Sequence, residues 1–275
     1  MLRNRPPARE EMDAFASLQK SIERLVRIRC SNYKEDYIKR RILSRMRLTS
    51  TADFEAYHKY LLANPEEVDL LRNALTINVT KFFRDPEVFE VLRREVLPDL
   101  AARHGSIRIW CAGCATGEEP YSLAILAHDL AALRDGVNVT IYATDIDAVV
   151  LEKAKAGIYD RKALENVDER QLRRHFISRE DGTFEVRPHL KEIIKFRQHD
   201  LMSGVPIARY LDAVSCRNVT IYFTERQKNE LTRLFHGALA VDGYYVMGKT
   251  EYLGREVEHL FKPYNIMQKI LRKAA

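Results

Sequence analysis

Residues 106–120 read SIRIWCAGCATGEEP, and the class of fold follows from this segment. Its first seven residues form a run rich in isoleucine and tryptophan, which is typical of a buried strand. Small residues follow at once, and a helical stretch begins near Glu118. A strand, a tight turn and a helix in this order predict the opening unit of a parallel α/β sheet.

The alternation of strand and helix continues downstream of this segment. PYSLAILAHDLAAL reads as a helix, VTIYATD as a strand and AVVLEKAKAG as a further helix. Later strands are expected at Ile193–Phe196, Leu211–Ser215 and Tyr244–Gly248, with a last edge strand near Ile266–Ile270. These elements predict an α/β domain with a parallel sheet and crossover helices.

One charged stretch, about 157–192, interrupts the alternation. It carries a turn signal at Asp181-Gly182 and then alternates in TFEVR. We expect a small antiparallel β-subdomain inserted into the sheet domain. A surface insertion without a function is the ordinary alternative.

The first 76 residues have a different texture. Apolar residues recur at helical spacing between Glu11 and Leu75, with no alternating run. Asp53 is placed to cap one helix, and Asn64-Pro65 marks a boundary between two. We therefore expect an all-helical domain over 1–76 and the α/β domain over 77–275.

Composition excludes several classes of protein. The 275 residues are 46% hydrophobic and 31% charged, and no stretch approaches the roughly 18 apolar residues that a membrane span needs. Four cysteines give no disulfide framework, so we expect a cytoplasmic protein without membrane insertion. The net charge is +6, and a basic stretch between Lys20 and Arg47 predicts an acidic partner.

The turn after the first strand is a candidate ligand site. Backbone N–H groups at a helix N-terminus attract a ligand, and glycine lets it approach closely. The spacing Gly113-x-x-x-Gly117 departs from the dinucleotide pattern. Glu118 and Glu119 would repel a pyrophosphate but suit an ammonium and a cationic sulfur. The alternative is that both glutamates only favour the helix N-terminus.

An acidic residue ends the second strand. Asp145 is placed to accept hydrogen bonds from ribose hydroxyls, whereas Asp147 could instead cap the following helix. A ribose and no phosphate together favour S-adenosylmethionine over NAD. Cys111 and Cys114 have the spacing of a zinc or redox pair, but no second pair lies nearby, so we expect packing residues and no metal.

Two further polar segments lie beside the predicted sheet. The first, 75–85, joins the helical part to the sheet and places polar residues beside Phe82 and Phe83. The ordinary alternative to a functional role is a domain hinge in which Asp85 is the N-cap before Pro86, a helix-start signal. The second, 216–223, follows a buried strand, so its polar residues lie at the carboxyl edge where ligands bind in such sheets. The alternative is that Asn218 and Tyr222 are turn and core residues.

Five segments in order resemble the CheR family of chemotaxis receptor methyltransferases: INVTKFFRD, IWCAGCATGEEPYSLA, ATDID, LEKAKAGIY and CRNVTIYF. The resemblance implies a helical N-terminal domain and a Rossmann-like class I methyltransferase domain with a β-subdomain. It also implies methylation of receptor glutamates by S-adenosylmethionine, with S-adenosylhomocysteine as the product.

The resemblance also implies roles for single residues. Arg84 and Tyr222 would lie beside the transferring methyl group. Asp200 stands where relatives often have Asn, and the β-subdomain around Ser178–Arg187 is short, so we expect no tethering to a receptor's C-terminal pentapeptide. The cofactor-binding residues would be Asn78, Thr80 and Arg84 at the junction, Glu118 and Glu119 at the amino end, Asp145 at the ribose, Asp200 and Leu201 at the adenine, and Arg217 and Asn218 at the methionine portion.

The partner and the rival functions follow from the same residues. We expect the basic helix 34–47 of a monomer to dock on acidic receptor helices, with Arg41 and Arg45 on one face. A solvated charged face is the ordinary alternative. The rival functions are a methyltransferase for nucleic acid or a small molecule, and a non-catalytic scaffold that binds S-adenosylmethionine; we expect no nucleic-acid partner.

Overall fold

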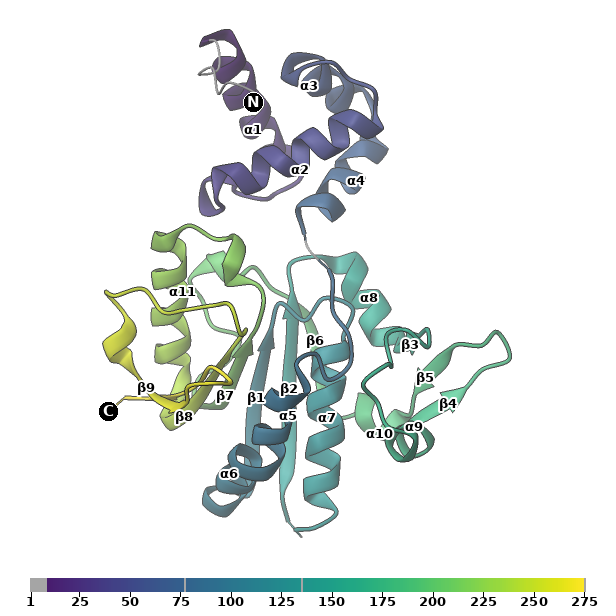
Figure 1. Cartoon of the computed structure of the whole chain (residues 1–275), viewed down its shortest axis with the longest axis vertical. Helices are drawn as coiled ribbons and strands as arrows, with labels where there is room; N and C mark the ends of the chain where they lie inside the picture. Colours follow the sequence, from purple (N-terminus) through teal and green to yellow (C-terminus); the bar gives the residue numbers. More distant parts are fainter. Residues whose placement is uncertain (1–8, 77, 135, 275) are drawn as a thin grey trace. The chain divides into compact units, whose positions relative to one another are not determined.

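A computed structural model describes residues 9–76, 78–134 and 136–274 (Figure 1). The chain divides into two compact units. Unit 1 comprises Met1–Ile77 with Tyr222–Thr224, and unit 2 comprises Asn78–Ile221 with Glu225–Ala275. Residues 1–8 of the expected helical domain, and Ile77 at its expected boundary, lie outside the described residues.

Unit 1 is helical around one apolar core. Its helices are α1 Arg9–Leu25, α2 Glu35–Leu48, α3 Phe54–Ala63 and α4 Pro65–Leu75. Their buried faces contribute Leu18, Ile22, Ile38, Ile42, Tyr57, Leu61 and Leu71. The Asp53 carboxylate accepts a hydrogen bond from Ala56 N at 2.8 Å, and α3 gives way to α4 at Asn64-Pro65. Both helix boundaries predicted from sequence are confirmed.

A short segment from late in the sequence completes unit 1. Lys34 N donates to Tyr222 O at 3.0 Å, and Thr224 N donates to Asn32 O at 3.0 Å. The Tyr222 ring packs on Tyr37, with ring centroids 4.8 Å apart. Residues 222–224 therefore belong to the helical unit, with Tyr222 packed against its core, although their neighbours in sequence belong to unit 2.

Helix α2 carries a buried ion pair that corrects one expectation. Arg45 donates from Nε and Nη2 to Glu67, at 2.9 and 2.6 Å, and the two side chains are only 14% and 3% exposed. Glu67 also accepts from the Tyr57 hydroxyl at 2.7 Å. The prediction that Arg45 docks on a partner is wrong, because it is committed to the core of unit 1.

Unit 2 is built on a seven-stranded sheet of order β6-β2-β1-β7-β8-β10-β9. Strands β6, β2, β1, β7 and β8 are parallel, and β10 runs antiparallel to β8 and β9. The chain turns between β9 and β10, so the expected edge strand near Ile266–Ile270 is wrong there. The strands are β1 Ser106–Ala112, β2 Asn138–Asp145, β6 Ile194–Gln198, β7 Leu211–Cys216, β8 Leu239–Met247, β9 Phe261–Asn265 and β10 Ile270–Lys273.

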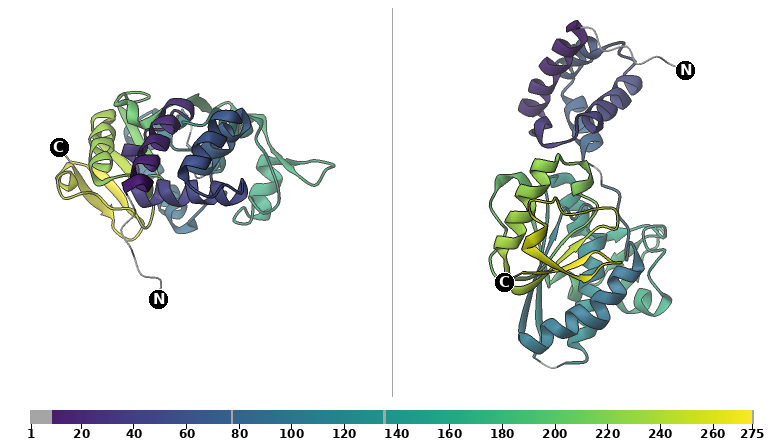
Figure 2. Two further views of the ribbon diagram at one scale, coloured as in Figure 1. Left: turned by 90° about the horizontal axis from the view of Figure 1, so that it is seen from above. Right: turned by 60° about the vertical axis from the view of Figure 1, so that its left-hand side comes forward.

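Helices cover both faces of this sheet (Figures 1 and 2). On one face, α6 contacts β1, and α7 contacts β2 and β6. On the other, Phe235 of α11 meets Trp110 of β1 with ring centroids 5.2 Å apart. Strand β1 is buried from both sides, as its apolar run predicts. The helices are α5 Pro86–Val91, α6 Leu97–Arg103, α7 Glu118–Ala131, α8 Ala148–Ala156 and α11 Glu225–Ala238, with a π-helical turn Leu92–Val96 between α5 and α6.

The expected β-subdomain is present. Strands β3 Ile158–Tyr159, β5 Phe184–Val186 and β4 Phe176–Ser178 pair antiparallel in that order. Thr183 N donates to the Asp181 carboxylate at 3.0 Å, and Gly182 takes a φ of 81°, which confirms the turn. Short helices α9 Glu169–His175 and α10 Pro188–Lys191 flank the strands.

Among the described residues, none of the helices combines the length and the apolar composition that a membrane span needs.

Candidate functional site

Strand order reverses beside β1, because β2 lies on one side of it and β7 on the other. In open α/β sheets, ligands bind at the carboxyl ends of the strands at such a point. The turn after β1 is shaped there by two glycines with positive φ, Gly113 and Gly117. A Cβ on Gly113 would lie 2.6 Å from Val219 Cγ2, and one on Gly117 would lie 2.8 Å from Ala154 Cβ. Neither position has room for a side chain.

Asp145 ends β2 beside this turn and is 9% exposed. One carboxylate oxygen accepts from Ala115 N at 2.9 Å, and the other from Asp147 N at 3.0 Å. Burial raises the pKa of this carboxyl above its usual value. Each carboxylate oxygen has two lone pairs, so both retain acceptor capacity for hydroxyl groups.

Asp147 has the capping role that the sequence left open for it. Its carboxylate accepts from Val149 N at 2.9 Å and begins α8. The Asn78 amide nitrogen lies 3.5 Å from its other oxygen. Asn78, a predicted cofactor residue, is thereby positioned at the end of β2.

Glu119 is the centre of a polar cluster drawn from β1, α7 and the end of β7. Its carboxylate accepts from Ser215 Oγ at 2.6 Å, Arg217 Nη1 at 3.1 Å and Cys111 Sγ at 3.5 Å. This arrangement leaves a carboxylate with acceptor capacity at the carboxyl edge of the sheet. Such a group suits a ligand ammonium.

Arg217 connects Glu119 to the segment before α5. Its side chain is buried, and Nη2 donates to Arg84 O at 2.7 Å and to the Asp85 carboxylate at 2.9 Å. Asp85 takes a φ of 58° and makes no capping bond to α5. Asp85 thus occupies the predicted N-cap position, but its carboxylate binds the Arg217 guanidinium and caps no backbone N–H of α5.

Glu118 points elsewhere. It accepts from Thr116 Oγ1 at 2.7 Å and lines a hollow of about 340 Å³ with Lys153, Tyr159 and Asp160. Burial raises the pKa of its carboxyl. Successive helix positions diverge by about 100°, so the structure brings Glu119 but not Glu118 to the Arg217 cluster.

The predicted segment 78–85 is held by two phenylalanines. Phe82 and Phe83 are buried in the sheet core, and Phe83 N donates to Ser122 Oγ at 2.9 Å. Arg84 is half-buried and donates from Nη1 to Val79 O at 2.9 Å. Arg84 therefore lies in a short loop whose base is anchored in the core of unit 2.

Asp200 and Leu201 follow β6, the strand next to β2. The Asp200 carboxylate accepts from Met202 N at 2.8 Å and begins a single 3-10 turn, Leu201–Ser203. His199 N donates to Asp145 O at 2.8 Å. This bond places the predicted adenine segment beside the predicted ribose residue.

Sequence reasoning missed Glu251, which is 2% exposed. It accepts five hydrogen bonds of 2.6–3.0 Å, from the backbone N of Gly248, Asn218, Val219 and Thr220 and from Thr220 Oγ1. It thereby fixes the loop after β7, including Asn218 with its φ of 61°. The available signal was its position just after β8, at the same edge of the sheet.

Comparison with known proteins shows which family the chain belongs to. Residues 78–270 match the family profile "CheR methyltransferase, SAM binding domain", and residues 13–76 match "CheR methyltransferase, all-alpha domain". The chain belongs to the CheR methyltransferase family. Its fold is accordingly an all-helical N-terminal domain followed by a class I methyltransferase domain.

Relatives in this family align over most of the chain. A "Chemotaxis protein methyltransferase" of Listeria innocua is 35% identical over 222 residues, which are 80% of this chain and 83% of that protein. "Chemotaxis protein methyltransferase 2" of Vibrio cholerae is 33% identical over 230 residues, 82% of this chain and 80% of that protein. An "Uncharacterized 104.1 kDa protein in hypE 3'region" of Rhodobacter capsulatus is 36% identical over 227 residues, but this chain spans only 24% of its length.

The cofactor of the CheR methyltransferase domain is S-adenosylmethionine, and the residues at the sheet edge fit it. Asp145 offers two acceptor oxygens for the ribose hydroxyls, and Glu119 offers an anionic acceptor for the ammonium. Glu119 directly follows the turn where a dinucleotide fold binds its pyrophosphate, and its charge would repel that group. The match to a SAM-binding domain confirms the expectation of S-adenosylmethionine rather than NAD.

Proposed function

We propose that this protein transfers methyl groups from S-adenosylmethionine to glutamate side chains on the cytoplasmic helices of a chemoreceptor, without a pentapeptide tether, and that it works in the cytoplasm as a monomer. The observation that carries the proposal is the match of both parts of the chain to the two domains of one methyltransferase family. The names of its Listeria and Vibrio relatives supply the chemotaxis context.

In this reaction the main task of the protein is to position the methyl donor and the carboxylate. When bound, S-adenosylmethionine supplies a methyl group on a cationic sulfur. A glutamate side chain is ionised near neutral pH, so the enzyme needs no strong general base. Holding the carboxylate in line and excluding water supplies most of the acceleration.

Arg84 and Tyr222 are the side chains proposed to orient the incoming carboxylate. One Arg84 nitrogen is engaged by Val79 O, which leaves further N–H donors on the guanidinium. The reaction neutralises the carboxylate, so an overly strong ion pair would stabilise reactants more than the transition state. Arg84 therefore orients the acceptor, and the Tyr222 hydroxyl adds a neutral donor.

The product distinguishes glutamate methylation from other methyl transfers. Incubation with labelled S-adenosylmethionine and receptor cytoplasmic fragments is expected to label the receptor, and mild base should release the label as methanol. Carboxyl esters hydrolyse under these conditions, whereas methylated amines and nucleic acids do not. Fragments with and without their last five residues should be labelled at equal rates. Base-stable label, or transfer only to RNA or DNA, would contradict the proposal.

A Tyr222→Phe variant tests the role of the hydroxyl in the same assay. Phenylalanine keeps the ring contact with Tyr37 and removes only the hydroxyl. The hydroxyl would donate to an ionised carboxylate, and loss of such a bond, worth about 1.5–3 kcal/mol, should slow the labelling about 10–150-fold. An unchanged rate would remove Tyr222 from the reaction while leaving the ester chemistry intact.

The receptor-facing surface is proposed to lie on α2. The structure changes which arginines of this helix belong to that surface. Arg40 and Arg47 are exposed, whereas Arg41 is half-buried over the Tyr37 ring. With Lys39, Leu43 and Asp36, these two arginines line a shallow hollow of about 260 Å³. A basic, shallow surface of this kind suits an acidic helix.

Charge-reversal variants of α2 distinguish an effect on receptor docking from an effect on folding. Arg40→Glu combined with Arg47→Glu should raise the KM for receptor while leaving the Kd for S-adenosylmethionine and the free energy of unfolding nearly unchanged. Arg45→Glu should instead destabilise unit 1 by about 3–5 kcal/mol, because Glu67 would be left buried without its partner. Denaturant titration and receptor kinetics measure the two effects. Unchanged receptor kinetics in the double variant would exclude this surface.

A further inference from the structure

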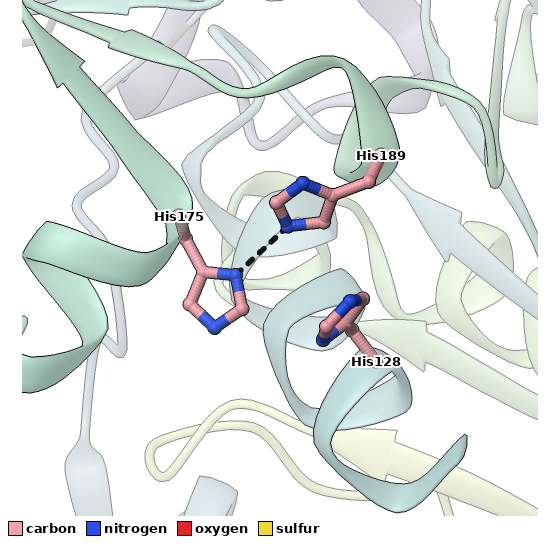
Figure 3. Close-up of side chains that lie close together, drawn as sticks. All are labelled: His128, His175 and His189. Atoms are coloured by element: carbon pink, nitrogen blue, oxygen red, sulfur yellow. Dashed lines mark hydrogen bonds between the residues drawn. The ribbon is translucent and has the colours of Figure 1, made fainter. Parts of the chain in front are cut away.

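Three histidines that are distant in sequence lie close together in unit 2 (Figure 3). His128 lies on α7, His175 ends α9 and His189 lies on α10. One ring nitrogen from each lies within 4.8 Å of one from each of the others. His175 Nδ1 and His189 Nε2 are 3.0 Å apart and share a hydrogen bond.

The cluster is buried on one side and reachable from the other. His175 is completely buried, whereas His128 and His189 are half-buried. His128 Nδ1 and His175 Nε2 are buried without a hydrogen-bond partner. Buried polar atoms in folded proteins normally have partners. His175 Nε2 has the Asp129 carboxylate 3.8 Å away, so His128 Nδ1 is the buried atom that an added ligand would satisfy.

One carboxylate lies beside the cluster. Asp129 accepts from Arg174 at 2.9 Å and lies 3.8 Å from His175 Nε2. The ring centroids of His128 and His189 are 4.6 Å apart, and each of these rings is 5.3 Å from the His175 ring. The three imidazoles thus form one compact group, and neutral imidazole is the form that binds metals.

We propose that His128, His175 and His189 bind one divalent transition-metal ion, with Zn²⁺ as the preferred ion and water as the fourth ligand. Three imidazoles and a water form a common tetrahedral zinc set, with Zn–N distances of about 2.0–2.1 Å. Such a site holds its nitrogens about 3.4 Å apart. The longest separations in the cluster, up to 4.8 Å, must therefore shorten through ring rotation.

Metal binding requires one proton to move within the cluster. The proton shared by His175 and His189 would leave the ligating nitrogen and reside on the other nitrogen of the same ring. For His175 that nitrogen is Nε2, which faces the Asp129 carboxylate. A histidine ligand whose second N–H faces a carboxylate is the usual arrangement around zinc. No net proton is released, and no redox step is involved.

The proposed ion would connect the β-subdomain to the sheet domain. His175 and His189 flank the subdomain strands, while His128 lies on the central helix α7. His128 is nine residues from Glu119 on that helix, or about 13 Å along its axis. The ion is thus too far away to take part in methyl transfer, and its role is to hold the subdomain in place.

Metal titration of the full chain, without a histidine tag and after dialysis against a chelator, tests the site. Calorimetry with Zn²⁺ should show one equivalent bound, with a rise in the Tm of the protein. Co²⁺ should give the visible bands of a tetrahedral site. His189→Ala and His128→Gln should each weaken Zn²⁺ binding at least about tenfold. His259→Ala, at an exposed histidine of the same unit, should leave it unchanged.

Two outcomes would overturn the proposal. One is the absence of a saturable equivalent of Zn²⁺. The other is binding that persists in both cluster variants, or that is lost equally in the His259 control. Binding of S-adenosylmethionine by each variant checks that it is folded, because neither cluster histidine touches the cofactor residues.

Discussion

Replacing Glu251 by glutamine is expected to destabilise unit 2 by about 2–6 kcal/mol, since at least two buried N–H donors would lose their acceptor. Oxygen Oε1 accepts from Val219 N, Thr220 N and Thr220 Oγ1, and Oε2 accepts from Asn218 N and Gly248 N. A glutamine amide must point its NH₂ group at one of these two sets. Donor would then face donor in a site from which water is excluded.

Denaturant unfolding, with calorimetry of S-adenosylmethionine binding, measures this effect. Affinity should fall together with stability, because Glu251 fixes the loop that carries Arg217 and Asn218. Glu258→Gln is the matched control, since Glu258 is exposed and the substitution is the same. It should change stability by no more than about 0.5 kcal/mol. Equal effects of both substitutions would show that the hydrogen bonds to Glu251 contribute nothing specific.

Replacing Asp145 by asparagine is expected to weaken S-adenosylmethionine binding by about 10–150-fold for each charge-assisted hydrogen bond lost, at 1.5–3 kcal/mol per bond. Asparagine keeps one acceptor oxygen, and its NH₂ group would face Ala115 N or Asp147 N. The ribose hydroxyls would then lose an ionised acceptor. Calorimetry with S-adenosylhomocysteine measures the change without turnover.

Asp168→Asn is the matched control, because it removes the same charge from a helix cap elsewhere in unit 2. Asparagine caps helices as well as aspartate does, so α9 should be unaffected. If Asp168→Asn weakens binding as much as Asp145→Asn, the effect is one of overall charge rather than of hydrogen bonds. In the native protein, affinity should also fall as the pH drops through the raised pKa of Asp145, since the ligand hydroxyls require the ionised carboxylate.

Local patterns in the chain were sufficient for the class of fold and for placing several predicted cofactor residues at one edge of the sheet. The β1 turn, the Asp53 cap and the Asp181-Gly182 turn each depend on residues within a few positions of one another. Asp145 followed from the rule that acidic residues end the second strand of such sheets. Short-range hydrogen bonding and side-chain periodicity are properties that a sequence displays directly.

Other features could be recognised only in the folded structure, because the residues that interact lie far apart in the sequence. From the sequence, Arg45 was expected to be a surface cation on α2. In the structure it forms a buried ion pair with Glu67, 22 residues away. Asp85 was expected to cap α5, but Arg217 lies 132 residues downstream and binds its carboxylate. Glu251 had only its position after β8 as a signal, and the three histidines had none. Their burial and their contacts depend on how the strands and helices pack. The role of a carboxylate or an imidazole therefore depends on the residues that this packing places around it.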